Sequence, residues 1–218
     1  EFRRVLFRSD FRCTETGPIT RIVFWGSWRE DKVGEIKNVH MSIHEDDRTG
    51  RFSKPGRLLW EADTADGRVR LVVHAEPEYG EQGWCDPNSG EWKRPDHTMY
   101  FKHTLEIPDE MAFAQKKGMI YWLDLQIDCM GGEWGWKTSR AAHFEDDAVW
   151  DDTPQQPHQW RELIDPDTKL SIDLAFVIGG KEIEPEPKYD FGDAPDRPYP
   201  TLLSNDGARH LIVPGMCL

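Results

Sequence analysis

The sequence of 218 residues contains no apolar run that approaches the roughly 20 residues of a membrane-spanning helix. It has no Cys-x-x-Cys spacing of the kind that zinc sites use and no His-x-His pair. The signatures G-x-x-x-x-G-K-[ST], G-x-S-x-G, G-x-G-x-x-G and H-E-x-x-H are also missing. We therefore expect no direct membrane insertion, and no familiar catalytic motif is available to assign.

Positive charge is scarce relative to negative charge. The chain has 27 Lys and Arg residues against 40 Asp and Glu residues, which gives a formal net charge of −13. Such a balance argues against nucleic acid and anionic membranes as partners, because both require a basic surface. It is compatible with an extracellular protein or with binding of a divalent cation.

The residues that are present favour short strands. The chain has 15 Pro, 18 Gly and 10 Trp, and apolar residues recur at every second position in several stretches. Val39, Met41 and Ile43 alternate with polar residues, and the same period continues over 99–107 and 119–129. We predict an all-β fold: a single antiparallel, jelly-roll-like β-sandwich of about nine strands with one short helical turn after Pro108.

The sequence pattern divides the chain into four segments. Residues 1–9, EFRRVLFRS, resemble the translation of a sequencing adaptor, so we expect them to be disordered and any signal peptide to lie upstream. Residues 10–180 carry the period-two pattern of the β-sandwich. Residues 181–188, KEIEPEPK, have the composition of a linker. Residues 189–218 are predicted to be the truncated start of a second module.

One local connection is also predicted. The runs Arg57–Ala62 and Arg68–Glu76 flank a turn that contains Asp66 and Gly67. Because Asp-Gly favours tight reversals between paired strands, the two runs are expected to form a hairpin.

Several stretches together resemble an uncharacterised β-sandwich family of secreted bacterial multidomain proteins. They are FRCTETGPITRIVFWGSW (11–28), AFAQKKGMIYWLDLQ (112–126), EWGWKTSRAAHFEDDAVW (133–150) and LSIDLAFVIGG (170–180). Separately, DFGDAPDRPYPTLLSNDGARH resembles the opening of a repeat module of adhesin-like surface proteins. These resemblances imply export to a secreted or cell-surface location and other domains in the same chain. They carry over no catalytic residues.

Tryptophans are the best candidates for ligand binding. Trp134 and Trp136 are two residues apart, so they share a face in extended chain. A pair of exposed indoles would suit the apolar face of a sugar ring. The alternative is that these side chains close the ends of the sandwich. The candidate ligand-binding residues are Trp134, Trp136, Trp150 and Trp160.

Acidic residues cluster in the same region. Calcium takes six to eight oxygen ligands, often from loops, so a structural calcium ion is one interpretation. The other is a solvated acidic loop, because the spacing is not that of an EF-hand. No further cofactor is expected. The candidate metal ligands are Glu145, Asp146, Asp147, Asp151 and Asp152.

The cysteines leave two alternatives open. Cys13, Cys85 and Cys129 lie in the predicted sandwich and are disulfide candidates, whereas Cys217 lies in the second module. The other alternative is buried thiols in a reducing compartment. His40 and His44 are four apart in an extended run, about 13 Å, and are interpreted as surface residues rather than ligands of one ion.

The functional prediction is a non-catalytic extracellular module, structural or glycan-binding, whose partner is a glycan or cell-surface polymer. One alternative is a glycan-active hydrolase with an unrecognised carboxylate pair. Asp124 and Asp128 do not supply that pair, because their separation of about 13 Å along a strand exceeds the roughly 5–9.5 Å that the chemistry uses. The other alternative is a purely structural spacer.

Overall fold

The computed structural model of the chain describes residues 5–74, 76–139, 148–153, 157–180, 189–191 and 209–211. The chain divides into two compact units, residues 1–180 and 181–218. In the second unit, strand β15 (Tyr189–Phe191) pairs antiparallel with β16 (Arg209–Leu211). No helix in the described residues is long and apolar enough to cross a membrane.

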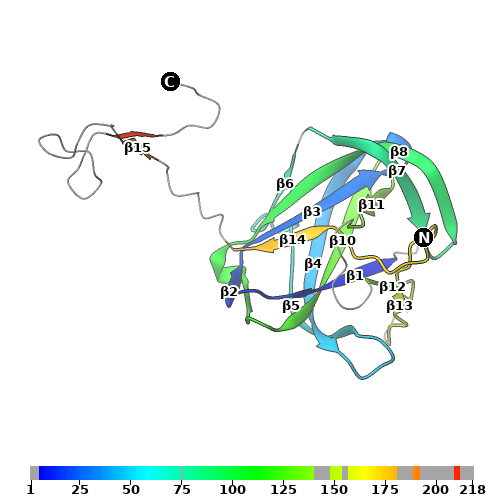
Figure 1. Ribbon diagram of the computed structural model, residues 1–218, viewed down its shortest axis with the longest axis horizontal. Helices are drawn as coiled ribbons and strands as arrows, with labels where there is room; N and C mark the ends of the chain where they lie inside the picture. The colour runs from blue at the N-terminus through cyan, green and yellow to red at the C-terminus, as the bar shows by residue number, and fades with distance from the viewer. Residues whose placement is uncertain are drawn as a thin grey trace, which may run out of the picture. The chain divides into compact units, whose positions relative to one another are not determined.

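The first unit is an all-β sandwich, and most of its strands are labelled in Figure 1. The first sheet has six antiparallel strands in the order β13-β12-β1-β10-β4-β5. Their bounds are Arg161–Glu162 (β13), Val149–Asp151 (β12), Leu6–Arg12 (β1), Ile120–Met130 (β10), Glu35–Asp47 (β4) and Lys54–Asp63 (β5).

The second sheet is built on two long strands, β3 (Arg21–Trp28) and β8 (Glu91–Glu106). On the edge of β3 that faces away from β8, two short strands pair with it one after the other. Two further short strands pair in the same way with the outer edge of β8. They are β11 (Trp134–Trp136) and β14 (Phe176–Gly179) beside β3, and β6 (Arg70–Val73) and β7 (Glu78–Asp86) beside β8. A small separate pair is formed by β2 (Gly17–Ile19) and β9 (Phe113–Gln115).

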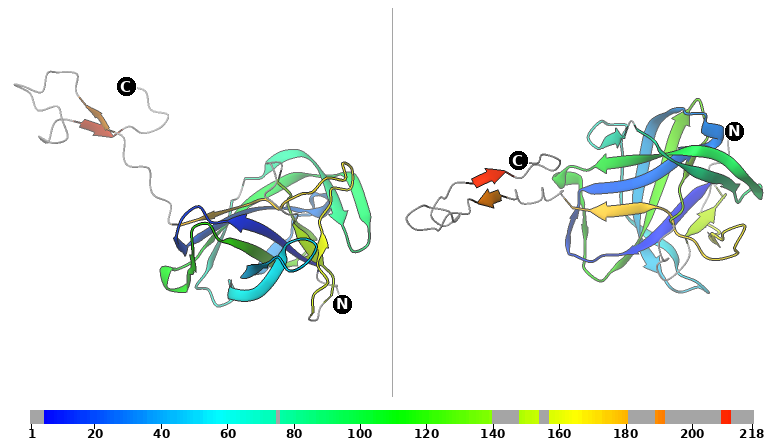
Figure 2. Two further views of the ribbon diagram at one scale, coloured as in Figure 1. Left: turned by 60° about the horizontal axis from the view of Figure 1, so that its bottom comes forward. Right: turned by 45° about the horizontal axis from the view of Figure 1, so that its top comes forward.

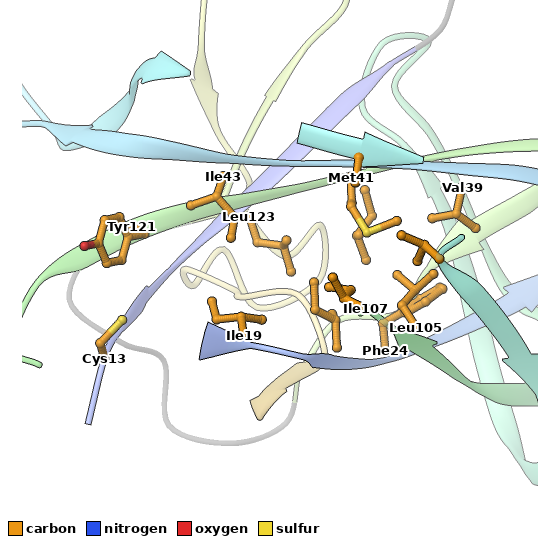
Figure 3. Close-up of a cluster of buried hydrophobic side chains, with 14 residues drawn as sticks. Cys13, Ile19, Phe24, Val39, Met41, Ile43, Leu105, Ile107, Tyr121 and Leu123 are labelled. Carbon is orange, nitrogen blue, oxygen red and sulfur yellow. The ribbon is translucent and has the colours of Figure 1, made fainter. Parts of the chain in front are cut away.

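The two sheets face each other, as the ribbon views of Figure 2 show, and the hydrophobic core lies between them (Figure 3). Val39, Met41 and Ile43 of β4 are fully buried, as the period-two pattern predicts. Across the interior they meet Phe24 of β3 and Leu105 of β8. The all-β prediction is confirmed. The structure has more strands than predicted because several edge strands are only two to four residues long.

Strand β1 corrects the expectation for the first nine residues. Leu6–Ser9 belong to β1, which lies between β10 and β12 in the first sheet. Arg8 is paired in register with Asp124 of β10 and with Val149 of β12. This part of the chain is therefore an inner strand of the sandwich rather than a disordered extension.

The predicted hairpin around Gly67 is wrong. The chain does turn there, with Gly67 at a φ of 75° and its N–H donating to the Thr64 carbonyl oxygen. However, β5 before the turn pairs with β4 in the first sheet, and β6 after it pairs with β8 in the second. The Asp66-Gly67 turn determines that the chain reverses at this point. The partner of each flanking strand is determined by which side chains become buried in the two sheets.

The short helical turn predicted after Pro108 is a 3-10 turn. Asp109–Met111 form a single 3-10 turn after Pro108, and Phe113–Gln115 already return to extended chain as β9. Gly118 has a φ of 82° in the turn that leads into β10, and its N–H donates to the carbonyl oxygen of Cys13.

Candidate ligand pocket

The outer face of the first sheet, which points away from the core, carries buried polar residues. Register places Arg8, Asp124 and Ser42 in one row across β1, β10 and β4. Trp122 and His44 occupy the next row. All five are 7% exposed or less. Buried polar groups need hydrogen-bond partners within the protein, and the partners of these five residues define the site.

Arg8 and Asp124 form a buried ion pair. The Nε atom of Arg8 donates to Oδ2 of Asp124 at 3.0 Å, and Nη2 of Arg8 lies 3.0 Å from the same oxygen. The Cζ atom of Arg8 lies 4.6 Å from the ring centroid of Trp160, in cation–π geometry. The guanidinium therefore links the sheet to the segment that covers it.

His44 is held in one tautomer. Its Nδ1 donates to the Gly56 carbonyl oxygen at 3.3 Å, because that oxygen can only accept. Its Nε2 then accepts from the Ser42 hydroxyl at 2.9 Å. Burial, with the nearby positive charge of Arg8, lowers the pKa of His44 to about 4. His44 is thus neutral at physiological pH, and the expectation of a surface histidine is wrong for this residue.

Asp151, at the end of β12, organises the segment that covers the sheet. Its carboxylate is fully buried and accepts hydrogen bonds from Nδ1 of His158 at 2.7 Å and from the N–H groups of Thr153 and Gln159. Although burial opposes it, this set of donors holds the pKa of Asp151 below its usual range. Because Nδ1 of His158 faces Asp151, Nε2 is left to contact another partner.

These elements enclose an open pocket of about 370 Å³. It lies between β1, the first half of β5 and the segment after β12. A pocket of this size falls at the lower end of the roughly 300–1,000 Å³ range of small-ligand sites. The lining residues are Arg8, His44, Lys54, Pro55, Gly56, Arg57, Leu58, Pro157, His158 and Trp160.

The structure separates the four candidate tryptophans. Trp134 packs on Phe24 with ring centroids 6.0 Å apart, and a Cβ atom on Gly26 would overlap its ring. Trp136 donates from Nε1 to the Ala175 carbonyl oxygen and packs against both hydrophobic clusters. Trp150 is only 8% exposed. Trp160 lines the pocket, so it alone of the four keeps a place in the candidate site.

Of the five candidate metal ligands, only Asp151 and Asp152 lie in the described residues. Glu145, Asp146 and Asp147 lie outside the described residues. Asp151 is occupied by the donors above, and Asp152 accepts from Nη2 of Arg161 at 2.6 Å. In the described ranges, no group of three or more His, Cys, Asp and Glu side chains is arranged to hold a metal ion.

The three described cysteines are free thiols. Cys13 is buried and donates to Oε1 of Gln115 at 2.8 Å, and burial raises the pKa of its thiol to about 11. Cys129 donates to the Gly132 carbonyl oxygen at 3.4 Å, whereas Cys85 is exposed. No disulfide joins any two of these three residues, and Cys217 lies outside the described residues.

Most pocket residues were missed by the sequence analysis. Arg8 was set aside with residues 1–9, and Lys54 and Arg57 belong to a strand with no distinctive motif. One available signal was Trp122, a large apolar side chain on the polar face of the central strand. An indole at that position indicates that the outer face of the sheet is covered.

Comparison with known proteins assigns the family. Residues 4–179 match the domain of unknown function DUF7901. The chain belongs to this family. The matched range spans the whole sandwich, from the start of β1 to the end of β14, so the pocket lies within the DUF7901 domain. No curated protein matches the chain, and no solved structure does.

Proposed function

We propose that this DUF7901 domain is a non-catalytic, extracellular sugar-binding module of a secreted or cell-surface multidomain protein. The observation that carries the proposal is the pocket in which the indole of Trp160 stands beside Arg8 and His158. Flat aromatic rings contact the apolar faces of sugar rings, and neighbouring polar groups bind their hydroxyls. The second unit beyond residue 180 and the resemblance to exported bacterial modules support the multidomain setting.

The polar groups of the pocket suit hydroxyl recognition. The Asp151 contact orients His158, and the Gly56 and Ser42 contacts fix His44, so both rings have defined orientations before a ligand arrives. Groups fixed in this way lose little entropy on binding. The size of the pocket suits a terminal or branching sugar rather than a long stretch of polymer.

Glycoside hydrolysis finds less support at this site. That chemistry requires two carboxyl groups roughly 5–9.5 Å apart on either side of the bond that is cleaved. Within the described ranges, no Asp or Glu residue lines the pocket.

A structural spacer is the second candidate. It is favoured by the packing of Trp134, Trp136 and Trp150 in or against the two hydrophobic clusters.

The test is retention on a panel of immobilised polysaccharides and glycans. We expect Trp160→Ala to abolish retention, and Trp160→Phe, which keeps a ring over Arg8, to retain part of it. Trp92→Ala is the matched control, because Trp92 is also partly exposed but lies on β8, away from the pocket. Melting temperatures of all variants identify any loss of folding. Retention that survives Trp160→Ala in a folded protein, or no retention by the parent chain, contradicts the proposal.

A further inference from the structure

The pocket is lined by basic side chains in an acidic protein. Arg8, His44, Lys54, Arg57 and His158 all contribute to its wall. The chain as a whole has 40 acidic against 27 basic residues, so the basic lining of the pocket contrasts with the acidic composition of the protein. In the portion of the chain that is described, the groups presented to a ligand are therefore mainly hydrogen-bond donors and cations.

The carboxylates that pair with Arg8, Lys54 and Arg57 do not themselves line the pocket. Asp124 is fully buried beneath Arg8, and Asp47 lies 3.7 Å from Nζ of Lys54. Glu45 pairs with Arg57, whose side chain is 72% exposed. Exposed ion pairs of this kind are weak and exchange readily with a competing anion.

Arg57 has donors to spare for such an anion. Its Nε and Nη2 atoms contact the Glu45 carboxylate at 3.3 and 2.5 Å. A guanidinium carries five N–H groups in a planar fork, so Nη1 can bind a second anionic group without breaking the first pair. Lys54, three residues earlier on β5, lines the same pocket and adds a mobile ammonium.

We propose that the pocket selects glycans that bear acidic substituents, either carboxylate or sulfate groups, through Lys54 and Arg57. This inference rests on the proposed function: Trp160 would contact the sugar ring, and the two cations on β5 would contact its acidic group. His44 contributes shape rather than charge, because burial keeps it neutral and both of its ring nitrogens already contact Gly56 and Ser42.

The experiment measures the affinity of the full chain for polymers that differ only in charge. One arm compares polygalacturonate with its methyl ester, and the other compares dextran sulfate with dextran. We expect at least tenfold tighter binding to the acidic member of one pair, and the arm that responds identifies the acidic group. The double variant Lys54→Met, Arg57→Gln should reduce that affinity to the level of the neutral polymer.

The matched control is Lys37→Met, Arg70→Gln. Arg70 is exposed and contacts Glu106 through Nε and Nη2, as Arg57 contacts Glu45, and Lys37 is an exposed partner of Glu35. Neither residue lines the pocket. If the parent chain binds both members of each pair with equal affinity, and Trp160→Ala abolishes this binding, the proposed function stands but the inference is overturned. An equal loss in the control also overturns it. Failure to bind any polymer overturns both.

Discussion

His158 and Asp151 form the contact on which the covering segment of the pocket depends: Nδ1 of His158 lies 2.7 Å from Oδ2 of Asp151, whose side chain is fully buried. The same carboxylate also accepts from Thr153 and Gln159. One side chain therefore anchors backbone and imidazole alike. Its loss should affect the pocket before it affects the core.

Asp151→Asn should lower the free energy of unfolding by about 2–3 kcal/mol, because an amide cannot accept from every donor that the carboxylate serves. Urea unfolding at pH 7 measures the change. Because the pKa of Asp151 is lowered in the folded protein, its contribution to stability is complete above the pKa that the same carboxyl has in the unfolded chain. The contribution is lost as the pH falls from that value through the lower pKa of the folded protein. A double-mutant cycle with His158→Gln isolates their contact. A coupling energy near zero would contradict the assigned role.

His103 should make the domain sensitive to mild acid. It is 1% exposed, stacks on Phe24, and neither ring nitrogen has a hydrogen-bond partner among the described residues. Burial, with nearby His74, lowers its pKa to about 4. Since the unfolded chain binds the proton near pH 6.5, stability falls as the pH drops from that value, by about 3 kcal/mol at pH 4.

His103→Phe should remove this part of the acid dependence and stabilise the domain at pH 5. Urea midpoints between pH 7 and pH 4 provide the measurement, with His40→Gln on the outer face as the control. A variant with the acid dependence of the parent protein would show that His103 is not the group that titrates.

Gly26→Ala should destabilise the domain by about 3 kcal/mol or more, because the new methyl group would overlap the indole of Trp134 in a packed interior. Gly179→Ala is the matched control: Gly179 is also in a strand, and nothing lies within 4 Å of its Cβ position. Thermal unfolding compares the two variants. Equal melting temperatures would place Trp134 outside the core and return it to the list of ligand-binding candidates.

Arg8→Met should lower the free energy of unfolding by about 3–5 kcal/mol, because it leaves the carboxylate of Asp124 buried without its cation. Arg12→Met, at the exposed end of the same strand, should change it by about 1 kcal/mol or less. Chemical unfolding of both variants tests whether β1 is an inner strand. A small effect of Arg8→Met would restore the interpretation of residues 1–9 as a disordered extension.

The cysteines can be tested by alkylation at pH 8, followed by mass spectrometry of the peptides. In the native protein, exposed Cys85 should react well before Cys13, because a thiol with a pKa near 11 has only about a thousandth of its population as thiolate at that pH. After unfolding without reductant, both should react fully. Thiols that remain unreactive in the unfolded chain would show that disulfides form.

The sequence predicted the core better than the site. Val39, Met41 and Ile43 alternate strictly with polar residues, and this local period determines which side of a strand is buried. The same period places Trp134 and Trp136 on one face, but it does not say whether that face points inward. The answer depends on Gly26, which lies far away in sequence and leaves room for an indole ring.

The pocket lay further beyond sequence reasoning. Its wall combines β1, β4, β5 and the segment after β12, and these meet only because β1 enters the sheet between β10 and β12. Trp160 was a candidate, but Lys54 and Arg57 gain their significance from neighbours that no local pattern reveals.

The central position of β1 also has a consequence for synthesis. Arg8 precedes its partner Asp124 by 116 residues, so β1 leaves the ribosome long before β10 does. At about 5–20 residues per second, the delay is on the order of ten seconds. During that interval the nascent strand has neither of its neighbours. The first sheet cannot form on both sides of β1 until β12 has emerged. Production of this domain should therefore respond to translation speed and to chaperones that hold nascent chains.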